Sequence, residues 1–318
     1  MSSQAKFTDL INYMNHKIVG QSELNKRLVI SLLTGGHLLV EGAPGLAKTT
    51  AIKTLSSCID CSYHRIQFTP DLLPADLTGT DIYIPEEHCF RFQEGPLFHN
   101  FLLADEINRA PAKVQSALLE AMGEKQITIG RTTYPLPQLF LVMATQNPIE
   151  QEGTYQLPEA QLDRFMLFVK INYPDASSEA QILALNRGEE NNANLTKPHL
   201  SQSDIFTAQS ELNKIHLSKS VEEYLIQLIM ATRYPAKYSE NLAKWISFGS
   251  SPRGTIALER AARANAWLEG RDYVMPADIH AMIHEVLRHR ILLTFEAQVE
   301  NITSDKIIDE ILELVAIP

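Results

Sequence analysis

The residues of this sequence best suited to chemistry form a glycine-containing stretch that ends in a lysine and a threonine. The stretch GAPGLAKT, residues 42–49, directly follows the apolar run His37–Val40. Its spacing follows the phosphate-loop pattern, in which backbone N–H groups surround a polyphosphate and the next helix directs its N-terminus at the anion. In that pattern Lys48 reaches the β- and γ-phosphates, and the hydroxyl of Thr49 holds Mg²⁺. The residues expected to bind the nucleotide here are Gly42, Ala43, Pro44, Gly45, Leu46, Ala47, Lys48, Thr49 and Thr50.

A pair of acids supports this site, although one residue of the loop departs from the strict pattern. Ala47 stands where the pattern has its second glycine, and the stretch alone could be a strand-to-helix turn with an incidental lysine. However, Asp105 and Glu106 directly follow the apolar run Phe101–Ala104. Strands of an open α/β sheet present their C-terminal ends to the ligand. We therefore expect Asp105 to contact Mg²⁺, through water, and Glu106 to polarise an attacking water.

Three further polar side chains lie where they could act on the phosphates. Asn147 follows another apolar run, where its amide could orient the water or contact the γ-phosphate, although Asn-Pro alone is only a turn signal. Arg164 lies just ahead of a strand-like run, and Arg253 lies in the first turn of a helix that Ser251 would cap. A cation in a first turn opposes the helix dipole. A phosphate ligand would account for Arg253, and an exposed ion pair is the alternative.

The elements that must position these residues alternate between strand and helix in the first half of the chain. Runs that are apolar on both faces suit the interior strands of a parallel sheet, and the helical patterns between them predict a three-layer α/β core with a five-stranded parallel sheet. Beyond Pro174 the polar connection 188–198 is followed only by helical patterns. We expect an α/β core over residues 1–190 and a small all-helical domain over residues 199–318. The five predicted strands are His37–Val40, Ile66–Phe68, Phe101–Ala104, Leu139–Ala144 and Met166–Ile171.

Composition narrows the class of protein. The chain has 318 residues, with 28 Lys plus Arg against 38 Asp plus Glu, so the formal net charge is −10. This balance makes general nucleic-acid binding unfavourable, because neutralising phosphates needs a basic face. Three cysteines are too few for a disulfide scaffold, and the N-terminus lacks a signal-peptide core. The apolar runs are also too short to span a bilayer. These features predict a cytoplasmic protein.

Together these residues resemble the MoxR family of AAA+ ATPases over nearly the whole chain, including the alanine at position 47. The resemblance implies an AAA+ core with a helical lid, bound ATP and Mg²⁺, and oligomers that are usually rings of six with ATP at each subunit boundary. The residues that match the two Walker motifs are Lys48, Thr49, Asp105 and Glu106. The other stretches that carry the likeness are Ile18–Gln21, Phe68–Pro74, Asp105–Pro111, Gln115–Met122, Ala144–Pro148, Leu157–Phe165 and Val286–Arg290.

The resemblance also implies roles outside the Walker motifs. Asn147 matches sensor 1, and Arg253 matches sensor 2, which binds phosphate within the same subunit. Arg164 matches the arginine finger, which reaches the neighbouring subunit's nucleotide and stabilises charge in the transition state. Val19 and Gly20 would lie near the adenine.

For function, the resemblance implies chaperone-like remodelling, assembly or metal-cofactor insertion of client proteins, often with a von Willebrand factor A-domain partner. Two insertions, residues 79–97 and 126–135, would face the pore of the ring, and the second has the alternation of a short β-hairpin. Two alternatives remain: a DNA-acting AAA+ motor and a slow nucleotide-gated binding scaffold. The acidic balance, and the lack of a basic cluster in either insertion, count against the first.

Two other sets of residues receive weaker interpretations. Cys58 and Cys61 have metal-ligand spacing with His64 nearby, but the sequence offers too few further ligands for a closed zinc site. Arg109 could be a second contact across a subunit interface or a surface charge.

Overall fold

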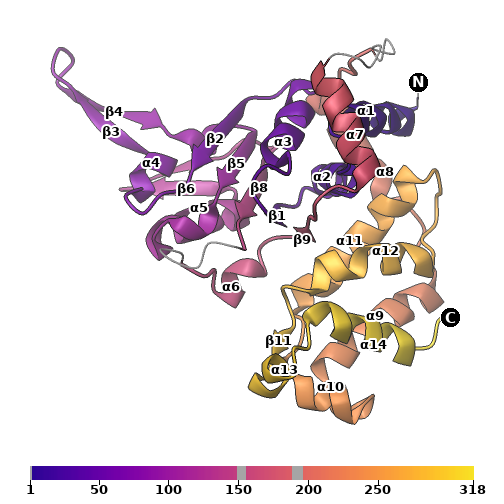
Figure 1. Ribbon diagram of the computed structural model, residues 1–318. Coiled ribbons are helices and arrows are strands. Elements are labelled where there is room, and N and C mark those ends of the chain that lie inside the picture. Colours follow the sequence, from indigo (N-terminus) through magenta and orange to yellow (C-terminus); the bar gives the residue numbers. More distant parts are fainter. Residues whose placement is uncertain (1, 149–154, 188–195) are drawn as a thin grey trace.

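The computed structural model describes residues 2–148, 155–187 and 196–318 (Figure 1). Its centre is a five-stranded sheet with the order β2-β5-β8-β1-β9, and every neighbouring pair is parallel. The predicted α/β fold with a five-stranded parallel sheet is thereby confirmed. The strands are β1 (Leu38–Glu41), β2 (Tyr63–Gln67), β5 (Phe101–Asp105), β8 (Leu141–Gln146) and β9 (Leu167–Lys170).

Alternate residues of the central strands enter two separate cores, which explains why these strands are apolar on both faces. On β5, Phe101 and Leu103 pack into one core, whereas Leu102 and Ala104 pack into the other. The first core contains helices α1 (Ser3–Lys17), α2 (Ser22–Thr34) and α3 (Lys48–Ser57), and the second contains α5 (Ala112–Glu124) and α4 (Pro74–Thr78). The edge strand β2 begins three residues earlier than predicted, because its exposed polar residues hide it from an apolar pattern.

Both insertions are antiparallel hairpins, as expected for the second one. Strands β3 (Gly79–Ile84) and β4 (Cys89–Glu94) form one, and β6 (Gln126–Ile129) and β7 (Thr132–Pro135) form the other. Stacking of Phe92 on Tyr134, with ring centroids 4.2 Å apart, joins the two hairpins. The β3–β4 hairpin projects from the core on the side away from the C-terminal helices (Figure 1).

The C-terminal part is helical apart from one short antiparallel pair, β10 (Ile246–Phe248) with β11 (Leu292–Leu293). The apolar residues of this part belong to the first core, which also contains α1 and α2, so the two parts share one apolar interior. The predicted boundary at residue 190 lies outside the described residues. None of the helices in the described ranges is long and apolar enough to cross a membrane. The helices of this part are α8 (Gln202–Leu212), α9 (Lys219–Arg233), α10 (Glu240–Trp245), α11 (Pro252–Leu268), α12 (Pro276–Leu287), α13 (Phe295–Val299) and α14 (Ser304–Leu314).

Five shorter or connecting elements complete the described chain. Helix α6 (Glu159–Leu162) precedes β9, and α7 (Ala176–Arg187) follows it. Short 3₁₀ helices are η1 (Pro96–Phe98), η2 (Ile107–Arg109) and η3 (Pro235–Lys237).

A buried polar junction fastens the helical lid to the sheet next to Arg164. Asp163 ends helix α6, and its carboxylate accepts hydrogen bonds from Nε of Arg290 at 2.8 Å and from the Ser251 hydroxyl at 2.9 Å. Arg290 is 7% exposed and also donates to the carbonyls of Phe165 at 2.6 Å and Met166 at 3.2 Å. The lid and the chain on both sides of Arg164 are therefore one hydrogen-bonded unit.

Replacing Asp163 with alanine is expected to lower the free energy of unfolding by about 3 kcal/mol, because the Arg290 guanidinium would stay buried without its carboxylate. Urea unfolding measures this change. Asp309→Ala is the matched control, since its exposed pair with His284 should contribute less than about 1 kcal/mol. Equal losses in the two variants would contradict the importance of the junction.

His37, directly before β1, is buried and ties two layers together. Its Nδ1 accepts from the Val142 N–H at 3.1 Å, so the neutral ring carries its proton on Nε2, which donates to the Met122 carbonyl at 3.4 Å. Burial, aided by the charge of Lys125, lowers the pKa of His37 from 6.5 to about 4, against the opposing effect of the Met122 bond. The fold therefore requires the neutral ring.

This requirement predicts loss of stability in acid. Below pH 6.5 the unfolded chain binds a proton at His37 that the folded chain refuses until about pH 4. The free energy of unfolding should fall by about 3 kcal/mol across this window on account of His37 alone. In His37→Asn, which keeps an acceptor for Val142 and does not titrate, urea unfolding should show a correspondingly shallower pH dependence. Parallel curves for the two proteins would refute this assignment.

Candidate nucleotide-binding site

The predicted phosphate loop connects β1 to α3, and its backbone suits an anion. Lys48 is the first residue of α3, and no side chain caps this helix, which leaves the N–H groups of its first turn available to a ligand. Gly45 has φ +85°, and a Cβ at Gly42 would lie 2.3 Å from Ile171. Ala47 has φ +56°, the left-handed conformation that glycine adopts most readily. Alanine therefore takes the glycine's conformation here, at a cost of about 1 kcal/mol.

A pocket of about 390 Å³ brings the loop together with the acids and Asn147. The loop comes from β1, Asp105 and Glu106 from the end of β5, and Asn147 from the end of β8. Of the other residues predicted to bind nucleotide, Gly42 and Ala43 lie in the loop but do not line this pocket. The residues lining it are Pro44, Gly45, Leu46, Ala47, Lys48, Thr49, Thr50, Arg65, Gln67, Asp105, Glu106 and Asn147.

Val19 and Gly20 also lie outside the lining of this pocket. They connect α1 to α2, and Gly20, with φ +77°, lies against Pro174, where a Cβ would come within 2.9 Å of the proline ring. The structure thus places Gly20 beside the segment that follows β9, and the contact with adenine that the resemblance implies for these two residues stays a prediction.

Lys48 spans the loop. Its ammonium donates to the Gly42 carbonyl at 2.6 Å. Burial lowers the pKa of Lys48, and the charges of Asp105, Glu106 and Glu41 oppose that shift. The ammonium therefore sits between loop carbonyls and the acids of the adjoining strands, where an incoming phosphate would be its strongest partner.

Both oxygens of Asp105 are engaged by side chains of neighbouring strands. Oδ1 accepts from the Thr145 hydroxyl at 2.6 Å, and Oδ2 accepts from Nη2 and Nε of Arg65 at 2.7 and 3.1 Å. Asp105 is 9% exposed, and Arg65 supplies the opposite charge within the chain.

Glu106 is held in a similar way. Its Oε2 accepts from the Gln67 amide at 2.6 Å and from Nη1 of Arg109 at 3.0 Å, and its own N–H donates to the Thr145 hydroxyl at 2.9 Å. Its backbone is left-handed, with φ +56°, which turns the side chain out of the strand direction and into the pocket. Arg109, whose role the sequence left open, thus contacts a predicted catalytic acid of its own chain.

Sequence reasoning missed Arg65, Gln67 and Thr145. Arg65 and Gln67 alternate with the buried Ile66 on β2, and Gln67 lies opposite Asp105 in register. A period of two on an edge strand was the available signal. Its significance emerges only once β2 is known to pair with β5.

The two predicted arginines lie together in a second pocket, of about 310 Å³, and neither lines the first. Arg164 donates to the Leu119 carbonyl at 2.8 Å and occupies the space left by Gly123, where a Cβ would lie 2.0 Å from Nη1. Arg253 lies 3.7 Å from Oδ2 of Asp163 and remains largely exposed. The N–H of Arg253 donates to the Ser251 hydroxyl at 3.1 Å, which matches the predicted helix cap.

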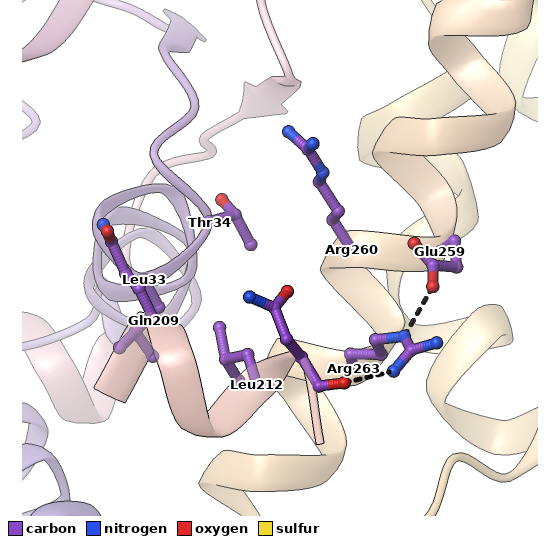
Figure 2. Close-up of a pocket in the computed structure, with 8 residues that line it drawn as sticks. Leu33, Thr34, Gln209, Leu212, Glu259, Arg260 and Arg263 are labelled. Atoms are coloured by element: carbon purple, nitrogen blue, oxygen red, sulfur yellow. Dashed lines mark hydrogen bonds and ion pairs between the residues drawn. The ribbon is translucent and has the colours of Figure 1, made fainter. Parts of the chain in front are cut away.

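A third pocket, of about 420 Å³, opens between α2, α8 and α11 (Figure 2). Its lining includes Thr34, Gln209 and Arg260, and Arg263 donates to Glu259 and, at 3.4 Å, to the carbonyl of Asn213. None of the predicted site residues lines it.

The donor set of the first pocket fits magnesium. Thr49 and Asp105 offer a hydroxyl and a carboxylate, the hard oxygen ligands that Mg²⁺ prefers, and Mg²⁺ in phosphate sites uses one or two such groups with phosphates and water. The structure also bears on the two cysteines that have metal-ligand spacing. Cys58 is buried, and burial raises the pKa of Cys61 to about 12, which keeps that thiol protonated and disfavours zinc binding there.

Comparison with known proteins places this geometry in a family. The family model described as "ATPase family associated with various cellular activities (AAA)" matches residues 37–167, and "AAA lid domain" matches residues 241–311. Chaperone MoxR1 of Mycobacterium tuberculosis is 44% identical over 95% of this chain and 79% of its own length. Protein MoxR of Paracoccus denitrificans is 34% identical over 91% and 89%. A crystal structure from Cytophaga hutchinsonii superposes with a TM-score of 0.90 at 49% identity, covering 99% and 96%. The chain therefore belongs to the MoxR family of AAA ATPases.

Proposed function

We propose that this ATPase hydrolyses ATP with Mg²⁺ in the phosphate-loop pocket and uses the cycle to remodel or assemble client proteins. The observation that carries the proposal is the meeting of Lys48, Thr49, two acids and Asn147 in one pocket. These residues come from three separate segments of the chain, and together they supply ligands for the phosphates and the metal, a base and a polar group to orient the water.

Each group has a distinct task. The loop amides and Lys48 hold the phosphates, and Thr49 and Asp105 hold the metal, which when bound neutralises charge that develops on the phosphates. Glu106 polarises the attacking water and takes its proton, while Asn147 orients that water. Gln67 and Arg109 hold one oxygen of Glu106 and so fix the direction of its carboxylate.

Two substitutions separate binding from hydrolysis. Lys48→Ala should lose ATP affinity, because it removes the cation that meets the phosphates. Glu106→Gln should still bind ATP, with hydrolysis at least about 100-fold slower, since the general base is gone. Calorimetry and phosphate release measure the two effects. Lys219→Ala, an exposed lid residue, is the control. Normal turnover in both site variants would overturn the proposed function.

We infer further that the chain forms a ring in which Arg164 and Arg253 both act on the neighbouring subunit's nucleotide. What supports this is that both arginines line one pocket, separate from the phosphate loop of their own chain. The junction at Asp163 also holds them on one unit. The prediction from the family resemblance, that Arg253 serves its own subunit, is the alternative that the mixing experiment separates from this one.

Mixing experiments test the assignment for each arginine. Arg164→Ala and Arg253→Ala should each hydrolyse ATP poorly alone. Each should regain activity when mixed with Glu106→Gln, because the intact acid of one subunit then meets the intact arginine of the next. If Arg253 served its own subunit, its mixture would stay inactive, since no site would hold both groups.

Clients are proposed to meet the two hairpins at the pore of a six-membered ring in the cytoplasm, with a von Willebrand factor A-domain partner. Exposed aromatic residues support a protein client: Tyr83 and Phe90 of the projecting hairpin are 47% and 71% exposed. The name of the relative Chaperone MoxR1 is consistent with this. The only cation of the hairpin among the described residues, Arg91, is paired with Glu87 at 2.9 Å, which disfavours nucleic acid there.

A further inference from the structure

Arg65 is a cation inside the nucleotide pocket for which neither the sequence pattern nor the proposed hydrolysis has a use. It extends from β2 beside β5, and Nη2 and Nε both donate to Oδ2 of Asp105, at 2.7 and 3.1 Å. The side chain of Arg65 is 50% exposed, whereas that of Asp105 is 12% exposed. The guanidinium therefore covers the carboxylate from the solvent side of the pocket.

The other oxygen of Asp105 is also taken. Oδ1 accepts from the hydroxyl of Thr145, which is 1% exposed and fixed within β8. The same hydroxyl accepts the N–H of Glu106, so moving Thr145 would disturb both acids. Oδ2 already accepts two hydrogen bonds from Arg65, so a cation or its water shell can reach this oxygen only if Arg65 gives way. Arg65 can do so, because its long side chain is half exposed and its other hydrogen bond, from Nη2 to Oε1 of Gln67 at 3.2 Å, lies on the exposed surface of the same strand.

We propose that Arg65 is a resident counter-ion of the metal site, which pairs with Asp105 while the pocket is empty and yields to Mg²⁺ when a nucleotide arrives. This rests on the proposed function of the pocket. Two cations compete for one carboxylate oxygen, so the metal alone must displace the guanidinium without compensation. A bound nucleotide changes this balance, because its phosphates offer the displaced guanidinium a new anionic partner in the same pocket.

The consequence is a coupling between two ligands. Arg65 weakens binding of the bare metal and favours binding of the metal together with nucleotide. The pocket also never holds two unpaired carboxylates, since Gln67 and Arg109 engage Glu106 as Arg65 engages Asp105. Arg65 is a positioning residue in this scheme: it acts on the metal through Asp105.

Metal binding to the nucleotide-free protein tests the proposal. Mn²⁺ prefers oxygen ligands, as Mg²⁺ does. It is titrated into the protein in the absence of nucleotide, and electron paramagnetic resonance measures the free and bound ion. Arg65→Gln should bind Mn²⁺ about tenfold more tightly than the unmodified chain, equivalent to about 1.4 kcal/mol. Arg65→Lys keeps the charge but loses the two-donor fork, and it should give a smaller gain. Unchanged or weaker Mn²⁺ binding in Arg65→Gln would overturn the proposal.

A double substitution separates the direct contact from a general change in charge. In an Asp105→Asn background, Arg65→Gln should leave Mn²⁺ affinity unchanged within about threefold, because the carboxylate for which the cations compete is gone. A tenfold gain that persists in this background would show that Arg65 acts by long-range repulsion and would refute the counter-ion.

The proposed function has its own readout in the same experiments. Calorimetry with ADP and chelator reports whether the pocket takes a nucleotide at all. If the unmodified chain binds no ADP with or without Mg²⁺, the proposed function fails. If it binds ADP normally while Mn²⁺ affinity is the same in Arg65→Gln, the counter-ion alone fails.

Discussion

Parallel strands end at the same edge of their sheet, and the arrangement of this molecule depends on that constraint. Strands β5, β8 and β1 are neighbours, so the acids, Asn147 and the phosphate loop leave the sheet side by side. These segments lie far apart in the sequence, and the order of the strands in the sheet brings them together. The two cores on either face of the sheet hold that order, and the buried ring of His37 joins β8 to α5 at the opposite end of β1.

The second organising property is that the charged side chains lining the nucleotide pocket have partners within the chain. Asp105 has Arg65 and Thr145, Glu106 has Gln67 and Arg109, and Lys48 has a loop carbonyl. Ligand binding then exchanges one set of partners for another. Such an exchange avoids the large free-energy cost of leaving a charge without a partner in a partly buried site. It also makes the affinity of each ligand depend on which partner that ligand displaces.

Much of the fold was predictable because its signals are local. Runs such as Phe101–Ala104 are apolar on both faces, and the loop of residues 42–49 has a spacing that few other structures require. The pairings of Arg65 and Gln67 were not predictable, because they depend on which strand lies beside β5. The place of Arg253 depends on how the lid packs on the sheet, which no local pattern specifies. At Ala47, the conformation expected of the phosphate-loop glycine is present without the glycine.

The junction at Asp163 has a mechanical consequence. Arg290 grips the carbonyls of Phe165 and Met166 while its Nε holds the carboxylate just before Arg164. The lid cannot rotate alone at this point, because its rotation relative to the sheet would break the buried hydrogen bonds of Arg290. The rotation is instead transmitted as displacement of the Arg164 backbone. In the ring proposed above, a rotation of the lid of one subunit would therefore move Arg164 relative to the nucleotide of the next subunit and change the rate of hydrolysis there.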